Sequence, residues 1–444
     1  MKEADVVVAG AGVAGCLAAR DLARKGHSVV LLEKHAAGKL GHDWWDTVEK
    51  DIFDKVDLQL PKPPELVRGY DFTLYSPFGK TGMNASMPPS KLNIDRKLFA
   101  KRLVSGAREA GAELIERASV EGPVLEGGRV VGVSVKYKDG TSETIRSKIC
   151  LDATGCSATL RSKMPEKYGF NNELKGEEYM VGYREIRNAK YSGKDSTLVV
   201  GEHEGIQWIC RDQEGLVDFF ACVPGKKEMK NPKEIVEEMI SREDDAGGKI
   251  MRGGYGGKIP VRRGFDSFVA PGFMLAGDSA CMANPLNGSG ISTALLAARL
   301  AAETAHKALQ AGRYDVETLW PYNVEYKKTQ DVKFAKLHLL QKLIYAEPKE
   351  HFHLFLTRGI FTPDTVWDME EKLKLKDNLE RLPKMLGLID HPLLLARIVF
   401  TFYLLNRLEK HYLDFPDRYD PRTFKAWSKR TRRLFNLVPK SGGK

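Results

Sequence analysis

A-D-V-V-V-A-G-A-G-V-A-G, residues 4–15, carries the clearest structural signal in the chain. Its first half is rich in β-branched side chains and predicts a buried parallel strand. Its second half is a G-x-G-x-x-G turn, after which apolar side chains recur at helical spacing from residue 13 to residue 25. A second strand is expected over residues 28–33, and it ends in Glu33. This strand–turn–helix–strand order predicts a dinucleotide-binding fold.

Each glycine of the turn has its own task. Gly10 permits the tight turn, Gly12 lets the backbone approach a pyrophosphate, and Gly15 lets the helix pack on the strand. The positive end of the helix dipole stabilises the phosphate charge. Glu33 stands where a carboxylate accepts hydrogen bonds from an adenosine ribose. The expected contacts of this unit are Gly10, Gly12, Val13, Ala14, Gly15, Glu33 and Lys34.

Two later segments repeat the pattern of a strand that runs into a small-residue turn. Residues 149–155 read I-C-L-D-A-T-G, and residues 273–278 read F-M-L-A-G-D. N-P-L-N-G-S-G at residues 284–290 then precedes a small-residue helix expected over residues 291–310. Backbone amides at the start of this helix would face an anionic part of a cofactor. The expected contacts are Gly155, Gly277, Asp278, Pro285, Gly288, Ser289, Gly290 and Ile291.

These segments resemble the motifs of known flavoproteins. D-A-T-G at residues 152–155 resembles the strand end of flavoprotein oxidoreductases, and Gly277-Asp278 resembles the motif of glutathione-reductase-type proteins whose aspartate binds the flavin-side ribose. I-D-R-K-L-F at residues 94–99 is similar to an element of the p-hydroxybenzoate-hydroxylase-like group, which implies that Arg96 reaches the FAD phosphates. A surface salt bridge is the alternative for Arg96, and Val120 is expected to give backbone contacts to adenine. Together the motifs predict a non-covalently bound FAD.

The order of the motifs over residues 1–310 resembles the geranylgeranyl reductase family of FAD-dependent oxidoreductases. The resemblance is strongest over residues 259–303. It implies an enzyme that reduces carbon–carbon double bonds of an isoprenoid or other apolar substrate by hydride transfer from N5 of the reduced flavin. The alternatives are a flavin-dependent monooxygenase or hydroxylase, and an electron-transfer flavoprotein that serves a partner or quinone. Halogenases of this scaffold carry a W-x-W-x-I-P segment that the chain lacks.

The expected architecture is α/β and has three parts. A Rossmann-like FAD-binding domain of glutathione-reductase type is expected over residues 1–160 and 255–330, including a β-meander. An antiparallel β-sheet substrate (cap) domain is expected over residues 70–90 and 165–255, with strands at residues 179–188, 197–202 and 216–223. Residues 331–444 are expected to form a helical C-terminal region, whose apolar residues 393–405 either pack on the body or contact lipid.

Two segments depart from the family pattern and bear on the substrate. In residues 205–211, G-I-Q-W-I-C-R, Trp208 matches a tryptophan of the family's isoprenoid pocket, whereas Cys210 and Arg211 replace an aromatic residue and a proline. Trp208 and Cys210 are therefore expected at the substrate, and Arg211 either lines the pocket or begins a turn toward solvent. Residues 41–46, G-H-D-W-W-D, stand where the family commonly has a cysteine.

This aromatic and acidic segment has two interpretations. Trp44 and Trp45 are expected to wall the isoalloxazine or a substrate ring. His42 is the expected proton donor, because an unperturbed imidazole titrates near neutral pH. The alternative is an ordinary packed loop with capping aspartates.

Composition limits the remaining possibilities. The chain has 444 residues, of which 42% are hydrophobic, and none of its uncharged stretches is both long and apolar enough to span a bilayer. It begins directly with a strand, which favours a cytoplasmic location. Its six cysteines lack the spacing of metal or iron–sulfur ligands, so no metal is expected. Electrons must then come from an external donor, either a ferredoxin-like protein or NAD(P)H. The chain has no second G-x-G-x-x-G, so a separate Rossmann domain for NAD(P)H is not expected.

The positive charge concentrates at the C-terminus. The chain has a net charge of +10, and residues 422–444 include eight basic residues and no acidic one, with aromatic residues between them. Such a segment suits peripheral contact with the inner face of a membrane, or docking on an acidic protein. The alternative is a helix that packs its apolar side on the body. Nucleic acid is not an expected partner, because no recognised binding module accompanies the charge.

Overall fold

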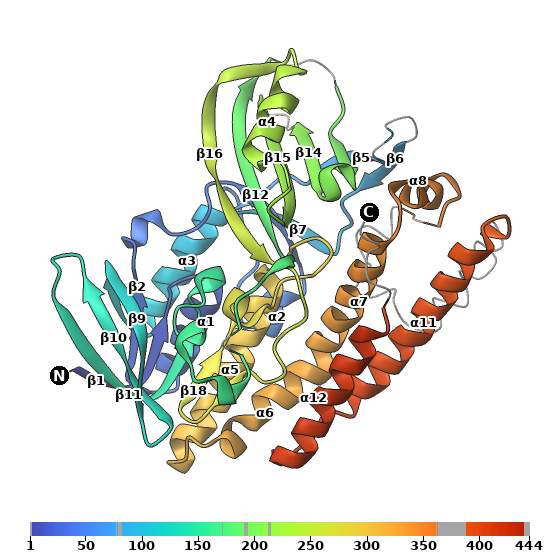
Figure 1. Ribbon diagram of the computed structural model, residues 1–444. Helices are drawn as coiled ribbons and strands as arrows, with labels where there is room; N and C mark the ends of the chain where they lie inside the picture. The colour runs from blue at the N-terminus through green and yellow to red at the C-terminus, as the bar shows by residue number, and fades with distance from the viewer. Residues whose placement is uncertain are drawn as a thin grey trace.

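The structure is a computed structural model, and it describes residues 2–76, 78, 82–170, 172–190, 194–211, 215–360, 362 and 388–438. Strands of the described residues form a main sheet, a cap sheet and a small sheet. In Figure 1 the cap sheet stands above the main sheet, and the C-terminal helices run along one side of both. The expected α/β architecture is confirmed.

The main sheet has a parallel core with the order β18-β11-β1-β2-β8. Buried valines and leucines fill β1 and β2, as expected for a parallel strand covered on both faces. β9 and β10 form an antiparallel meander with β11, and β17 pairs with β18. The strands are β1 (Lys2–Ala9), β2 (Val29–Glu33), β8 (Glu113–Glu116), β9 (Ala118–Glu126), β10 (Arg129–Tyr137), β11 (Ser142–Asp152), β17 (Val269–Ala270) and β18 (Phe273–Leu275).

Three helices pack around the main sheet: α1 (Val13–Arg24), α3 (Arg96–Glu109) and α5 (Ile291–Ala311). α1 and α5 contact each other, and alanines along both let their backbones approach closely. The strands and helices expected around the three glycine-rich turns are therefore confirmed. A small sheet of β3 (Trp45–Glu49), β4 (Leu66–Val67) and β7 (Lys91–Asp95), which the sequence did not indicate, and the short α2 (Ile52–Lys55) lie beside them.

The cap sheet has the order β16-β12-β15-β14-β13-β5-β6. Its three expected strands are confirmed, and residues 206–211 form a further strand. The glycine-rich β16 was not expected as a strand, and it continues beyond the boundary placed at residue 255. The elements are β5 (Asp71–Tyr75), β6 (Gly82–Ser86), β12 (Gly176–Ala189), β13 (Thr197–Val200), β14 (Ile206–Arg211), β15 (Leu216–Gly225), β16 (Ala246–Pro260) and α4 (Pro232–Ser241).

The two faces of the cap sheet have different neighbours. Side chains alternate between faces along a strand, and Tyr183, Val217 and Phe219 pack against α4 in one apolar cluster. Arg184 and Asp218 therefore project from the opposite face. Arg184 contacts Asp46 of β3, so this face turns toward the FAD-binding domain.

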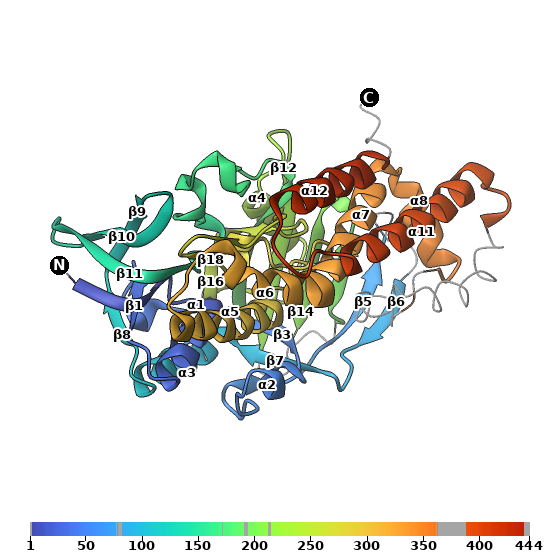
Figure 2. The same ribbon diagram turned by 90° about the horizontal axis from the view of Figure 1, so that it is seen from below.

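The C-terminal region is helical, as expected. α11 contacts both α7 and α12, and α11 and α12 lie along the outside of the molecule (Figure 2). The helices are α6 (Val316–Tyr326), a π-helical turn (Lys327–Asp331), α7 (Val332–Ala346), α8 (Lys349–Thr357), α11 (Pro392–Leu413) and α12 (Pro421–Asn436). Among the described residues, none of the helices has the length and apolarity needed to cross a membrane.

Candidate functional site

The carboxyl ends of three adjacent parallel strands bring the sequence motifs together. Ala9 pairs with Asp152, and Asp152 pairs with Leu275. The Ser279 hydroxyl donates to the backbone oxygen of Asp152 at 2.7 Å, which joins the turn after β18 to the end of β11. Ligands of open α/β sheets bind at this edge.

The first turn is packed on one side and open on the other. Gly10 has a φ of +96°, and a Cβ on it would lie 2.3 Å from the backbone oxygen of Ala153. A Cβ on Gly15 would lie 1.8 Å from the backbone oxygen of Gly10. A Cβ on Gly12 would meet nothing within 4 Å. The open space lies where a phosphate can approach the start of α1 at Val13.

The N-terminal ends of α1 and α5 lie close to each other. A Cβ on Gly277 would lie 3.4 Å from the Cβ of Ala14 and 3.8 Å from that of Ala294. The backbone N–H of Asn284 donates to the backbone oxygen of Ser289 at 2.7 Å and closes the loop before α5. This loop and the first residue of α5 contain Pro285, Gly288, Ser289, Gly290 and Ile291.

Glu33 ends β2 and is buried. Its carboxylate accepts hydrogen bonds from the backbone N–H of Ala11 at 3.0 Å and of His35 at 2.9 Å. A carboxylate has about four acceptor sites, so capacity is left for a ribose hydroxyl. Lys34 is exposed next to it, and Val120 is buried in β9.

Asp278 lies in the turn after β18, at the same edge of the main sheet as the other motif turns. Burial raises the pKa of its carboxyl group, and the positive charge of Arg96 partly opposes this effect. The Arg96 guanidinium also contacts Asp46 at 2.9 Å, and about a quarter of its side chain is exposed. Arg96 therefore forms a partly exposed ion pair with Asp46 and also lies near enough to Asp278 for its charge to act on that carboxyl group. A Cβ on Gly155 would meet nothing within 4 Å, so the space beside this backbone position is also open.

The motif turns fit FAD. They offer open backbone at Gly12 and Gly155, the ends of two helices, and acceptor carboxylates at Glu33 and Asp278.

A charged network that was not predicted from the sequence extends from Asp46, the partner of Arg96, into the cap sheet. Arg184 of β12 contacts Asp218 of β15 at 2.5 Å and Asp46 of β3 at 2.9 Å. Its guanidinium lies 5.0 Å from the ring centre of Trp208 and 5.5 Å from that of Trp44. Burial raises the pKa of Asp46, but the charges of Arg96 and Arg184 outweigh it and leave the pKa below its usual value.

Arg184 thus joins the two segments that depart from the family pattern. Arg184 and Asp218 lie on strands that carry no sequence motif. Their proximity could have been predicted only from the pairing of the cap-sheet strands, in which Arg184 is opposite Phe220.

His42, Trp44 and Tyr255 form an aromatic stack. The rings of His42 and Trp44 are 4.5 Å apart and nearly parallel, and the ring of Tyr255 lies 4.9 Å from that of Trp44. His42 is exposed, and desolvation by its neighbours together with the charge of Arg96 lowers the pKa of its ring. The imidazole is therefore neutral at pH 7. This direction differs from the unperturbed pKa on which the expectation of a proton donor rested.

The two adjacent tryptophans have different surroundings. Trp44 belongs to the aromatic stack, whereas Trp45 is buried at the start of β3 with the guanidinium of Arg252 5.4 Å from its ring centre. Arg252 of β16 also contacts Asp95 at 2.7 Å. Trp45 therefore helps to attach the cap sheet to β3.

Trp208 and Cys210 lie two residues apart on β14 and share a face of the cap sheet. The rings of Trp208 and Phe220 stack with centroids 4.0 Å apart, and the Trp208 indole donates to Asp218 at 3.2 Å. Burial raises the pKa of the Cys210 thiol, so the thiol stays protonated at neutral pH.

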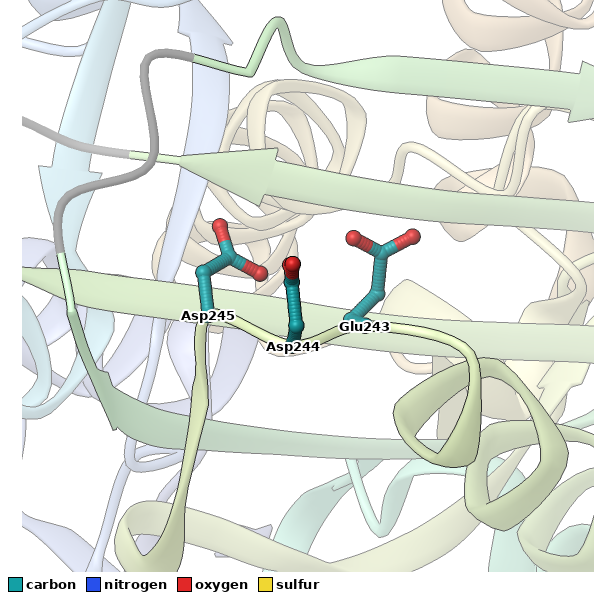
Figure 3. Close-up of side chains that lie close together, drawn as sticks. All are labelled: Glu243, Asp244 and Asp245. Carbon is teal, nitrogen blue, oxygen red and sulfur yellow. The ribbon is translucent and has the colours of Figure 1, made fainter.

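Arg211 adopts neither of the two expected arrangements. It contacts Asp245 at 2.7 Å and Glu243 at 2.6 Å, and only 11% of its side chain is exposed. Asp244 contacts Lys194 at 2.6 Å. Figure 3 shows the three carboxylates side by side on the loop between α4 and β16. Their oxygens lie within 4.8 Å of one another, close enough for a metal ion, but basic side chains already neutralise them.

Known proteins share both the motifs and the fold. Residues 5–214 match the family model described as FAD dependent oxidoreductase. A digeranylgeranylglycerophospholipid reductase of Methanopyrus kandleri is 30% identical over 323 residues, which cover 69% of this chain and 78% of that protein. The chain belongs to the geranylgeranyl reductase family of FAD-dependent oxidoreductases. The digeranylgeranylglycerophospholipid reductase of Sulfolobus acidocaldarius is 25% identical over 98% of both chains, so this family member resembles it through the C-terminal helices as well.

Solved structures show how widely the fold is shared. A geranylgeranyl bacteriochlorophyll reductase-like protein of Thermoplasma acidophilum has a TM-score of 0.64 and 17% identity, and the match covers 98% of this chain and 100% of that one. The flavin-dependent brominase Bmp2 has a TM-score of 0.61 and the same identity, over 97% of this chain and 100% of its own. Since both reductase-like and halogenating proteins have this fold, substrate and reaction must be argued from the site of this geranylgeranyl reductase family member.

Proposed function

We propose that this FAD-dependent oxidoreductase reduces carbon–carbon double bonds in the isoprenoid chains of a glycerophospholipid. The proposal draws on the activity for which the relatives are named, one of which aligns with this chain over 98% of both lengths. When bound and reduced, FAD supplies a hydride at N5. The protein must then hold an alkene beside the flavin and exclude water.

The observation that carries the proposal is an apolar area on the cap-sheet face that turns toward the FAD-binding domain. Trp208 stacks on Phe220 there. Phe220 packs in turn on a cluster that includes Met180, Cys222 and Val261, all of them buried. A wall of this kind suits a hydrocarbon chain, because burying apolar surface is the main source of its binding energy.

The geometry of the motif turns suggests a role for each expected cofactor-binding residue. We infer that Glu33 binds the adenosine ribose, that the backbone around Gly12 binds the pyrophosphate, and that Asp278 binds the flavin-side ribose. Arg96 supplies positive charge near Asp278. We propose that the other contacts expected from the sequence also bind FAD, namely Gly10, Val13, Ala14, Gly15, Lys34, Val120, Gly155, Gly277, Pro285, Gly288, Ser289, Gly290 and Ile291.

Arg184 is proposed as a positioning residue. Its guanidinium is engaged by Asp46 and Asp218, so it fixes Trp44 and Trp208 on either side and does not bind a substrate anion. His42 contributes a neutral ring to the wall of the site and does not act as an imidazolium acid.

An anaerobic turnover experiment tests the function. The FAD-loaded enzyme, reduced with dithionite, is mixed with a digeranylgeranyl glycerophospholipid in detergent micelles and the lipid is analysed by mass spectrometry. We expect a gain of about 2 Da for each double bond that receives a hydride and a proton. Incorporation of oxygen on re-aeration would instead identify a monooxygenase. Unchanged lipid together with rapid reduction of an added quinone would identify an electron-transfer flavoprotein.

We also propose that the C-terminal helices contact an anionic membrane, where such a lipid resides. Leu393, Phe400, Tyr403 and Arg407 recur at helical spacing on α11, and the first three are 80%, 41% and 51% exposed. Beyond Arg407 lies a groove of about 570 Å³, lined by basic and apolar residues of α11 and α12. The lining residues are Arg407, Arg430, Arg433, Leu434, Asn436 and Leu437.

Vesicle co-sedimentation tests this contact. The wild-type enzyme is expected to pellet with phosphatidylglycerol vesicles and less with phosphatidylcholine vesicles, because cationic side chains favour anionic lipid. Leu393→Ser with Phe400→Ser should weaken binding to both kinds of vesicle, and Arg430→Ala with Arg433→Ala should remove the preference for anionic lipid. Equal pelleting of both double variants and the wild type would contradict the proposal.

A further inference from the structure

A second pocket, separate from the cap-sheet face, opens beside the end of β2. It has a volume of about 380 Å³. Its lining comes from the segment after β2, the turn between β8 and β9, and the end of β10. The lining residues are Lys34, His35, Ala36, Lys39, Arg117, Ser119, Lys136, Tyr137 and Lys138.

The lining of the pocket is strongly basic. Five of its nine lining residues are lysine or arginine. Within the described part of the chain, none of these five side chains forms an ion pair. Acids lie nearby, since the charge of Glu116 acts on both Arg108 and Arg117, and Glu143 accepts a hydrogen bond from Tyr137. None of the nine lining residues is acidic, so the lining itself carries a net positive charge.

Backbone geometry adds to this concentration of charge. Arg117 has a φ of +56°, a left-handed conformation that is costly for a residue other than glycine. Its N–H donates to the backbone oxygen of His35 at 3.3 Å, which holds the turn against the segment after β2. The strained turn thus holds Arg117 beside the lysines that follow β2 and those at the end of β10.

We propose that this pocket binds the phosphate monoester of a nucleotide reductant, as found at the 2′ position of NADPH. A concave pocket of this volume suits a small molecule better than a flat protein surface does. Guanidinium and ammonium groups together match a phosphate dianion. Lys34, which is also an expected FAD contact, lines the pocket and directly follows Glu33, so the reductant would lie next to the adenosine half of FAD. The inference rests on the proposed function, because a reductase of this kind needs an electron donor.

The test uses the FAD-loaded enzyme and follows bleaching of the flavin absorbance under anaerobic conditions, with NADPH or NADH as reductant. The variant is Arg117→Asn with Lys136→Ala and Lys138→Ala, in which asparagine tolerates the left-handed backbone. A matched control removes three other exposed charges with Lys62→Ala, Lys249→Ala and Lys425→Ala. The pocket variant should raise the Kd for NADPH about tenfold or more and leave that for NADH unchanged, since charged hydrogen bonds to phosphate are lost. Inorganic phosphate should compete with NADPH in the wild type only.

Three results would overturn the proposal: no saturable reduction of the wild type by NADPH, equal losses for NADPH and NADH, or equal losses in the pocket variant and the control. Weakened FAD binding in the pocket variant would assign the pocket to the FAD adenosine instead. Turnover of the lipid with dithionite as reductant is independent of this pocket. A failure of the proposed reductant site is thereby distinguished from a failure of the proposed reaction.

Discussion

Arg184 of β12 and Asp46 of β3 form an ion pair of 2.9 Å that joins the cap sheet to the FAD-binding domain. The same guanidinium contacts the buried Asp218 at 2.5 Å. One side chain thus links strands β12 and β15 of the cap sheet to β3, which directly follows Trp44. Because all three charges are largely removed from water, the network is sensitive to the loss of any member.

Arg184→Met should therefore destabilise the protein strongly. It leaves Asp218 buried without its cation, at a cost of about 3–5 kcal/mol. Urea unfolding followed by tryptophan fluorescence measures the effect. Arg184→Met combined with Asp218→Leu should recover much of the lost stability, because an apolar pair replaces a broken ionic one. A double variant less stable than Arg184→Met alone would show that the side chains act independently.

Two glycines of the first turn should respond differently to alanine. Gly12→Ala adds a Cβ into open space, so the fold should persist while FAD affinity falls about tenfold or more through obstruction of the pyrophosphate. Gly10→Ala forces a Cβ to 2.3 Å from the backbone oxygen of Ala153 at a φ of +96°, so the apoprotein itself should be destabilised. FAD titration and thermal unfolding of both apoproteins separate the effects. Identical behaviour of the two variants would refute this division.

Asp5 should make stability depend on pH in the acidic range. Burial raises its pKa, but hydrogen bonds from Lys148 and Ser28 outweigh burial and lower the pKa from 3.8 to about 2. Since the folded-state pKa is depressed, the contribution is fully present above the unfolded value of 3.8 and is lost as pH falls toward about 2. It amounts to about 1–2 kcal/mol.

Asp5→Asn measures this contribution. The difference in unfolding free energy between wild type and variant should be largest near neutral pH and should narrow as pH falls below about 4. A difference that does not vary with pH would mean that the carboxylate charge is not its source.

His42→Gln tests the neutral imidazole. Since the pKa of His42 lies below its usual value, the ring does not change its charge between about pH 6 and pH 8. The variant should keep the shape of the wild-type pH–rate profile, and its rate should fall by no more than a few-fold through lost stacking on Trp44. Loss of an inflection near pH 6.5, the ordinary imidazole value, would restore the histidine as the acid.

The turns at Gly10–Gly15, Asp152–Gly155 and Gly277–Asp278 could be predicted from the sequence because local order determines them. A strand that runs into glycines and then into a helix contains its own geometric requirements. The Arg184 network could not be predicted in this way. It depends on strands far apart in the chain, and an arginine on an alternating strand gives no signal of the face on which it lies. Strand β16 was likewise not predicted, because its glycines lower the β-propensity of the segment. Pairing with β12 nevertheless makes this segment a strand.

Trp208 is expected to set how well the apolar substrate binds. Trp208→Phe keeps a ring over Phe220 but loses the hydrogen bond to Asp218, so KM for the lipid should change by no more than a few-fold. Trp208→Ser removes most of the apolar contact and should raise KM about tenfold or more, while FAD binding and dithionite reduction of the flavin stay unchanged. Trp45→Phe serves as the control, because Trp45 is buried against Arg252 and away from this wall. If Trp45→Phe raised KM as much as Trp208→Ser did, the substrate wall would have to lie beside β3 and not on the cap sheet.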